Sequence, residues 1–348
     1  MAVNGIQGWC KVLPLHRISM FPQVFDRIRS ALYCFVPLFL QAAWVPAAAQ
    51  VDINQVQTIH RAVAAPRTSA NHTVLSRVDL VLVNVTVLDH AYHAVTGLEP
   101  ANFAVLDDRN PQTIKYCSST DDPVSVLVVL DASASMAVRI NDAVKALSEL
   151  ENTSNPQDDF GLVVIHDKPQ LVAHLDSIGS EVEPPGTIQP DGSTALWDGM
   201  YLGLRELQHN SRYQRKAMVV ISDGGDNHSR HTEDELKSLL KEADVEVYAI
   251  GLYDRNASRV EEMRGPFQLE EVTSVTGGRV FSVHTAEELA HAVTQISHEL
   301  RNQYILGYYP SNRNRDGKWR KLTVHLAGPG PTGKFRLYAK KGYYAPAE

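Results

Sequence analysis

Cysteine is rare in this chain, which has three in 348 residues. Cys10 and Cys34 lie in an N-terminal stretch that is typical of a signal peptide, so Cys117 is the single cysteine of the predicted mature chain. One cysteine excludes an internal disulfide framework, and the fold must therefore depend on packing. We interpret Cys117 as a buried, unreactive thiol rather than as a group that pairs between molecules.

Positive charge is also scarce: 33 Lys and Arg stand against 40 Asp and Glu, a formal net charge of −7. Removal of the predicted signal takes away four basic residues and one acidic residue, which leaves 29 against 39, or −10. Such an acidic chain is a poor binder of nucleic acid. The 44% hydrophobic and 21% charged residues are usual for a globular protein, and the length allows about two domains.

The common catalytic motifs are missing. The sequence contains no GxSxG elbow, no HExxH, no GxxxxGK[ST] loop and no GxGxxG directly after a predicted strand. These absences exclude the familiar serine hydrolases, zinc proteases and nucleotide-binding enzymes. We therefore predict that the protein is not an enzyme.

The N-terminus has the pattern of a secretory signal. Arg27 and Arg29 precede an apolar stretch over residues 31–40, and VPAAAQ then offers an A-x-A cleavage pattern that ends at Ala49. The segment before these arginines is long for a signal, and a start at Met20 gives a more typical length. We predict a secreted or periplasmic protein with cleavage after Ala49.

The alternative to cleavage is a retained membrane anchor. An anchor needs about 20 predominantly apolar residues, and Pro37, Gln41 and Pro46 interrupt this run. We therefore predict a signal peptide over residues 1–49 and no membrane span in the mature chain. The polar, aperiodic residues 50–73 that follow are predicted to be a flexible leader.

Strands alternate with helices through residues 122–300, which predicts a doubly wound, mostly parallel sheet of the α/β class. Ile140 and Leu196 begin apolar stripes at helical spacing. Thr232 with Glu235, and Thr285 with Glu288, are predicted capping boxes. The expected strands are VSVLVVL, FGLVVIH, PQLVAHL, AMVVIS, VEVYAIGL and GRVFSV.

Both flanks of this region read as strands without helices. Residues 74–121 contain LVLVNVTVLD, FAVLD and QTIKY, and residues 301–348 contain QYILGYYP, KWRKLTVHLA and KFRLYAKKGYY. Neither set has a partner sheet of its own. We therefore predict that the two chain ends form one accessory antiparallel β-sandwich.

Oxygen-bearing side chains follow two of the predicted parallel strands. The motif DASAS places Asp131, Ser133 and Ser135 at the end of the first buried strand, and Asp223 follows the strand AMVVIS. Thr194 in GST precedes a helix. Because ligands of such sheets bind outside the carboxyl ends of the strands, we expect these five side chains to meet there.

Two carboxylates and three hydroxyls are the hard oxygen donors that Mg²⁺ prefers. A bare DxSxS occurs by chance in about one chain in ten, so the prediction depends on its position after a buried strand and on the GST and SDG segments that accompany it. The sequence predicts a Mg²⁺ or Mn²⁺ site that retains room for an external anion.

These residues carry a resemblance. Through VVLDASAS, GSTALWDGM and VVISDGGDNHS the chain resembles the von Willebrand factor type A (VWFA) family, and its flanks resemble those of secreted VWFA-related proteins of acidobacterial type. The resemblance implies a Rossmann-like fold and a metal-ion-dependent adhesion site (MIDAS). It also implies that Asp131, Ser133, Ser135, Thr194 and Asp223 hold the cation, and that a ligand carboxylate fills the open position.

Other residues near these motifs have simpler interpretations. His228 and His231 suggest zinc, but with no third ligand they are better read as loop residues. Asp226 is either an acceptor behind the site or a solvated loop residue. Trp197 and Tyr201 are predicted to pack beneath the sheet rather than to rim a binding face.

We therefore expect a secreted adhesion or interaction module that grips an acidic side chain of a protein partner through the bound cation. One alternative is an envelope scaffold protein in which the cation has a purely structural role. A second is a metal-dependent phosphohydrolase, for which the sequence offers no nucleophile or general base. The sequence predicts neither the partner's identity nor the oligomeric state.

Overall fold

The computed structural model describes residues 80–119, 121–175, 188–223, 225–253, 260–328 and 333–347. The predicted signal peptide and leader, residues 1–73, lie outside this part of the chain. Within the described residues, every helix is too short or too polar to cross a membrane.

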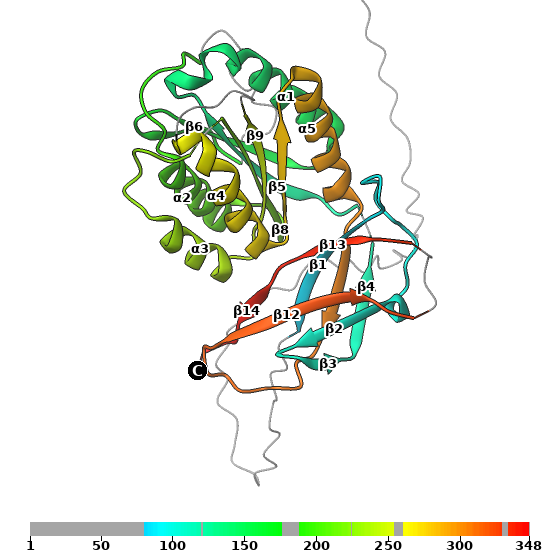
Figure 1. Cartoon of the computed structure of the whole chain (residues 1–348). Coiled ribbons are helices and arrows are strands. Elements are labelled where there is room, and N and C mark those ends of the chain that lie inside the picture. The colour runs from blue at the N-terminus through cyan, green and yellow to red at the C-terminus, as the bar shows by residue number, and fades with distance from the viewer. Residues whose placement is uncertain are drawn as a thin grey trace, which may run out of the picture. The chain divides into compact units, whose positions relative to one another are not determined.

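A six-stranded sheet forms the centre of the region 122–300, in the order β10-β9-β8-β5-β6-β7 (Figure 1). Its strands are parallel except β7, which runs antiparallel to β6 at one edge. The central strand β5 is buried along its whole length, as expected for a parallel strand covered on both faces. The strands are β5 (Val124–Asp131), β6 (Asp159–Ile165), β7 (Pro169–Ala173), β8 (Arg215–Ser222), β9 (Glu246–Leu252) and β10 (Val280–Val283). All six agree with the predicted strands.

Helices cover the two faces of this sheet. On one face, α1 (Ile140–Thr153) and α5 (Ala286–Arg301) pack on side chains such as Val126 and Val128. On the other, α2 (Leu196–Asn210), α3 (Glu233–Glu242) and α4 (Val260–Thr276) pack on the alternate residues, including Leu127 and Val129. The predicted doubly wound α/β fold is confirmed. Helix α4, which contains Pro266, was not predicted.

The two predicted capping boxes differ. At the start of α3, the Thr232 side chain accepts from the Glu235 N–H (3.2 Å) while the Glu235 carboxylate accepts from the Thr232 N–H (2.8 Å), so this box is confirmed. At the start of α5, Thr285 accepts from the Glu288 N–H (3.2 Å), but the Glu288 carboxylate accepts from the His284 N–H (2.6 Å). The second prediction is therefore half right, because the chain before Thr285 turns so that the earlier N–H faces the carboxylate.

The two chain ends form two four-stranded antiparallel sheets, β13-β1-β11-β4 and β14-β12-β2-β3 (Figure 1). Each sheet pairs strands from both ends, β1 with β11 and β2 with β12, so the predicted accessory sandwich is confirmed. KFRLYAKKGYY, predicted as one strand, divides into β13 and β14, which join different sheets. The strands are β1 (Val81–Leu88), β2 (Phe103–Asp107), β3 (Asn110–Gln112), β4 (Ile114–Ser118), β11 (Tyr304–Tyr308), β12 (Trp319–Leu326), β13 (Arg336–Ala339) and β14 (Gly342–Tyr344).

Buried tyrosines organise the core of the sandwich. Tyr304 donates its hydroxyl to the carbonyl of Val95 (2.9 Å), and Tyr308 donates to the buried Asp107 carboxylate (2.9 Å). Cys117 packs against this core but is partly rather than fully buried, and burial raises the pKa of its thiol. A raised pKa leaves little thiolate at neutral pH, in keeping with an unreactive cysteine.

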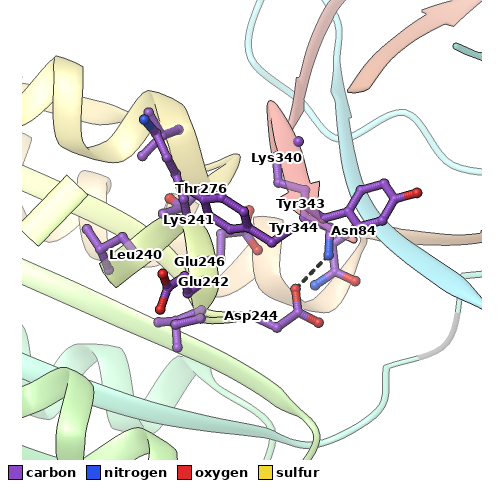
Figure 2. A pocket seen from close by; sticks show the side chains of 14 residues that line it. Asn84, Leu240, Lys241, Glu242, Asp244, Glu246, Thr276, Lys340, Tyr343 and Tyr344 are labelled. Carbon is purple, nitrogen blue, oxygen red and sulfur yellow. Dashed lines mark hydrogen bonds and ion pairs between the residues drawn. The ribbon is translucent and has the colours of Figure 1, made fainter. Parts of the chain in front are cut away.

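Gln303, between α5 and β11, joins the sandwich to the sheet of the α/β region. Its side-chain amide donates to Thr86 of β1 (3.2 Å) and to Glu246 at the start of β9 (2.5 Å). Beside this network lies a pocket of about 270 Å³. Figure 2 shows Lys340 and Asp244 facing each other across it, joined by an ion pair of 2.7 Å. This junction lies at the amino ends of the parallel strands.

Candidate metal site

The carboxyl ends of β5 and β8 place two acidic residues side by side. Asp131 is the last residue of β5 and is fully buried. Its two carboxylate oxygens accept from the Ser222 hydroxyl at the end of β8 (2.6 Å) and from the Ser133 N–H (2.9 Å). These contacts fix the Asp131 carboxylate at the edge of the sheet. Asp223 directly follows Ser222, the last residue of the neighbouring strand β8.

A short 3-10 turn, η2 (Ala134–Val138), follows the strand and arranges the serines. It brings the hydroxyls of Ser133 and Ser135 within 3.1 Å of each other. The Ser135 hydroxyl in turn donates to Oδ1 of Asp223, at 2.9 Å. Four of the five predicted site residues are therefore linked in one chain of polar contacts: Asp131, Ser133, Ser135 and Asp223.

Thr194, the fifth, is buried and is held through its backbone. Its N–H donates to Oδ1 of Asn227 (2.9 Å), and its carbonyl accepts from the N–H groups of Asn227 and His228 (both 3.1 Å). Upstream, the Gly192 carbonyl accepts from the Ala134 N–H (3.2 Å). The Thr194 segment is thus bonded both to the DASAS loop and to the loop after β8, while the role of its hydroxyl as a ligand stays a prediction.

Two acceptors in the loop after β8 place the Thr194 segment. Asp226 accepts from the Leu196 N–H (2.8 Å) at the start of α2, where a carboxylate satisfies unpaired helix N–H groups. Asn227 holds Thr194 as described above. The sequence left Asp226 open between two roles, and the structure assigns it as a helix cap behind the site. No local signal marked Asp226 as a cap, because the helix start that it caps lies 30 residues away in the chain.

Electrostatics at this edge favour a cation. Burial raises the pKa of the Asp131 carboxyl, and hydrogen bonds from Ser222 and Ser133 oppose that rise. Asp223 lies 3.7 Å from the guanidinium of Arg139, and its side chain is 6% exposed. A dication at this edge would favour the ionised form of the buried Asp131 carboxyl and would add positive charge beside Asp223.

The donor set fits octahedral Mg²⁺. Oxygen ligands at about 2.1 Å from Mg²⁺ lie about 3.0 Å from their octahedral neighbours. The hydroxyl pair Ser133–Ser135 (3.1 Å) and the pair Ser135–Asp223 (2.9 Å) have that spacing. A bound cation would supply positive charge for a further anionic ligand. Asp131 and Asp223 would hold it directly or through water, and Ser133, Ser135 and Thr194 would supply hydroxyl oxygens.

The neighbouring histidine and aromatic residues have structural roles. The ring of His231 pairs with Asp198 (2.7 Å) and stacks on Tyr201, with ring centroids 4.2 Å apart. Trp197 is buried in the core beneath the sheet, as predicted. Tyr201 is partly buried, so only Trp197 belongs fully to that core.

Residues 125–295 match the sequence model of the von Willebrand factor type A domain. This segment of the chain is a von Willebrand factor type A (VWA) domain. The match begins in β5 and ends within α5, so it spans the six-stranded sheet and the candidate site. The resemblance seen in the motifs is thereby confirmed for this segment, while the likeness of the flanks to acidobacterial proteins stays a prediction.

Known proteins resemble the chain at low identity. An uncharacterized protein of Borreliella burgdorferi is 24% identical over 196 residues, which cover 49% of this chain and 57% of that protein. A von Willebrand factor type A structure from Catenulispora acidiphila is 12% identical, with 77% of this chain and 73% of that chain covered and a TM-score of 0.43. The PilB minor pilin from Streptococcus sanguinis is 15% identical, covers 53% and 62%, and has a TM-score of 0.41.

Proposed function

We propose that the VWA domain is a metal-dependent interaction module that binds an acidic side chain of a protein partner through Mg²⁺ or Mn²⁺. The observation that carries this proposal is the polar chain Asp131–Ser133–Ser135–Asp223 at the carboxyl edge of the sheet, with spacings that suit octahedral coordination. A VWA domain supports an interaction module in general. The proposal adds to this general function a bound cation and an acidic ligand.

The donor chemistry explains why the site would bind rather than catalyse. The hydroxyls add no charge, and Asp131 and Asp223 neutralise the dication only partly if they bind it through water, so the cation keeps an affinity for a further carboxylate. Each protein donor is held by neighbours. Ser222 holds Asp131, and the loop after β8 holds the Thr194 segment. Such rigid donors favour a stable complex with an anionic side chain.

Thermal unfolding in the presence of Mg²⁺ tests the metal. A concentration a hundredfold above the Kd adds about 2.7 kcal/mol of stability, or about 4–5 °C in Tm for a chain of this size. In Asp131→Asn, which keeps an oxygen for the Ser133 N–H, we expect the Mg²⁺ response to vanish. Asp142→Asn is the matched control, because Asp142 is a partly exposed carboxylate on the first turn of α1 that pairs with Lys145 rather than with the site residues. A full response in Asp131→Asn would contradict the assignment.

Partner capture tests the ligand. Proteins that the immobilised chain retains in Mg²⁺ should be released by a chelator, and their binding should weaken when the acidic residues of the bound segment are changed to amides. A chelator that lowers Tm without releasing partners would instead favour the scaffold alternative.

We also propose that the protein is exported, on the basis of the predicted signal over residues 1–49, which lies outside the described residues. Sequencing the N-terminus of the protein recovered from the periplasm or the medium tests this. A first residue at Gln50 is the expected result, and an intact N-terminus would overturn it.

A further inference from the structure

The cluster of site residues includes one positive charge that belongs to the chain itself. Nη1 of Arg139 lies 3.7 Å from Oδ2 of Asp223, and the two side chains are 29% and 6% exposed. Asp223 meets the Ser135 hydroxyl through its other oxygen, Oδ1. The guanidinium of Arg139 therefore lies next to the carboxylate that is proposed to bind the metal.

Position in the fold explains why Arg139 is there. It is the residue between η2 and α1, and its backbone is fixed by the bond from its N–H to the Met136 carbonyl (2.8 Å) and by the bond from the Ala143 N–H to its own carbonyl (2.9 Å). These bonds use no side-chain atoms. The side chain can thus be replaced without disturbing the start of α1.

We propose that Arg139 is a resident counter-cation of Asp223 that the divalent ion must displace. This inference rests on the proposed metal site. Asp223 is almost fully buried, so in the metal-free chain the guanidinium supplies the positive charge that a buried carboxylate needs. When a dication binds, two positive groups compete for the same carboxylate. Arg139 then lowers metal affinity and sets the cation concentration at which the site fills.

The size of the effect follows from Coulomb's law. A dication and a unit charge on the order of 6 Å apart in a water-like dielectric repel by an amount equivalent to about a tenfold change in affinity. Removal of the charge should therefore tighten Mg²⁺ binding about tenfold at low ionic strength, and added salt should shrink the difference.

Isothermal titration with MgCl₂ tests the inference on the full mature chain. Arg139→Gln should bind Mg²⁺ about tenfold more tightly than the original chain, while Arg139→Lys, which keeps the charge, should bind like it. Arg212→Gln is the matched control, because Arg212 is exposed and precedes β8 at the opposite edge of the sheet.

Thermal unfolding gives a second readout. Without divalent ions Arg139→Gln should have a lower Tm than the original chain, and saturating Mg²⁺ should close that gap. Equal Mg²⁺ affinities for the original chain and Arg139→Gln would overturn the role of Arg139 and leave the metal site standing. If neither protein binds Mg²⁺, the proposed function fails first, and the counter-cation role falls with it.

Discussion

Replacing the buried Glu246 by Gln should remove a pH dependence of stability that originates at the junction with the sandwich. Burial raises the pKa of the Glu246 carboxyl to about 7, and hydrogen bonds from Gln303 and Tyr248 and the charge of Arg215 oppose this rise. The Gln303 amide and the Tyr248 hydroxyl lie 2.5 and 3.1 Å from its oxygens. A Gln side chain keeps one acceptor oxygen for the Gln303 amide and turns an N–H toward the Tyr248 hydroxyl, which can accept it, without a charge to bury.

The sign and size of this pH dependence follow from the difference between the pKa of Glu246 in the folded and in the unfolded chain. The unfolded chain ionises Glu246 near its ordinary pKa of 4.5, whereas the folded chain ionises it near 7. The folded state therefore holds the proton more tightly, so this contribution to stability is fully present below pH 4.5 and is lost as pH rises through 7. The full loss is about 3 kcal/mol at 1.36 kcal/mol per pKa unit, and most of it falls between pH 5 and pH 8.

Urea unfolding followed by tryptophan fluorescence at pH 5, 6, 7 and 8, without divalent ions, measures this. Between pH 5 and pH 8 the free energy of unfolding of the original chain should fall by about 2–3 kcal/mol relative to that of Glu246→Gln. Glu242→Gln controls for the loss of a carboxylate, because Glu242 is exposed at the end of α3. Parallel pH profiles for Glu246→Gln and the original chain would refute the reasoning.

Three further substitutions test the packing around the sheet by their urea midpoints. Gly278→Ala should destabilise by about 3 kcal/mol or more, since a Cβ there would lie 2.0 Å from a backbone carbonyl of β9; wild-type stability would contradict that close approach. Asp226→Ala should cost about 1–2 kcal/mol through the lost cap of α2 and should also weaken Mg²⁺ binding by calorimetry. Arg279→Met should cost about 3–5 kcal/mol, because it leaves Glu299 buried without its partner. Adding Glu299→Gln to that variant should recover much of the loss, and no recovery would mean that the pair is not the cause.

The strands of the sheet were predictable because burial on both faces demands continuous apolar runs, and VSVLVVL has no other simple interpretation. Helix α4 was not predictable in the same way. Gly265 and Pro266 interrupt its pattern, and both residues usually mark a turn. The helix is retained because its C-terminal part packs Leu269 and Val272 into the core beneath the sheet, a tertiary contact that no local pattern contains.

The residues of the candidate site were also predictable only in part. Asp131, Ser133 and Ser135 are close in sequence, and a local turn after a strand is enough to bring them together. Arg139 was missed because nothing in the sequence indicates that the side chain between η2 and α1 turns toward Asp223, just after β8, rather than into solvent. The charge balance of the site, as opposed to its ligands, therefore required the structure.

The segment SDGGDNHS shows why a motif can be read correctly and still be read incompletely. Its first aspartate, Asp223, accepts from the Ser135 hydroxyl, whereas Asp226 and Asn227 accept from the N–H groups of Leu196 and Thr194. One loop thus presents a carboxylate to the site and also fixes the segment that carries the predicted fifth donor. Asn227 is not a predicted ligand, so a change at Asn227 should alter metal affinity only by shifting Thr194. The polar residues of this loop therefore include one predicted ligand, Asp223, and two residues that hold the Thr194 segment in place, Asp226 and Asn227.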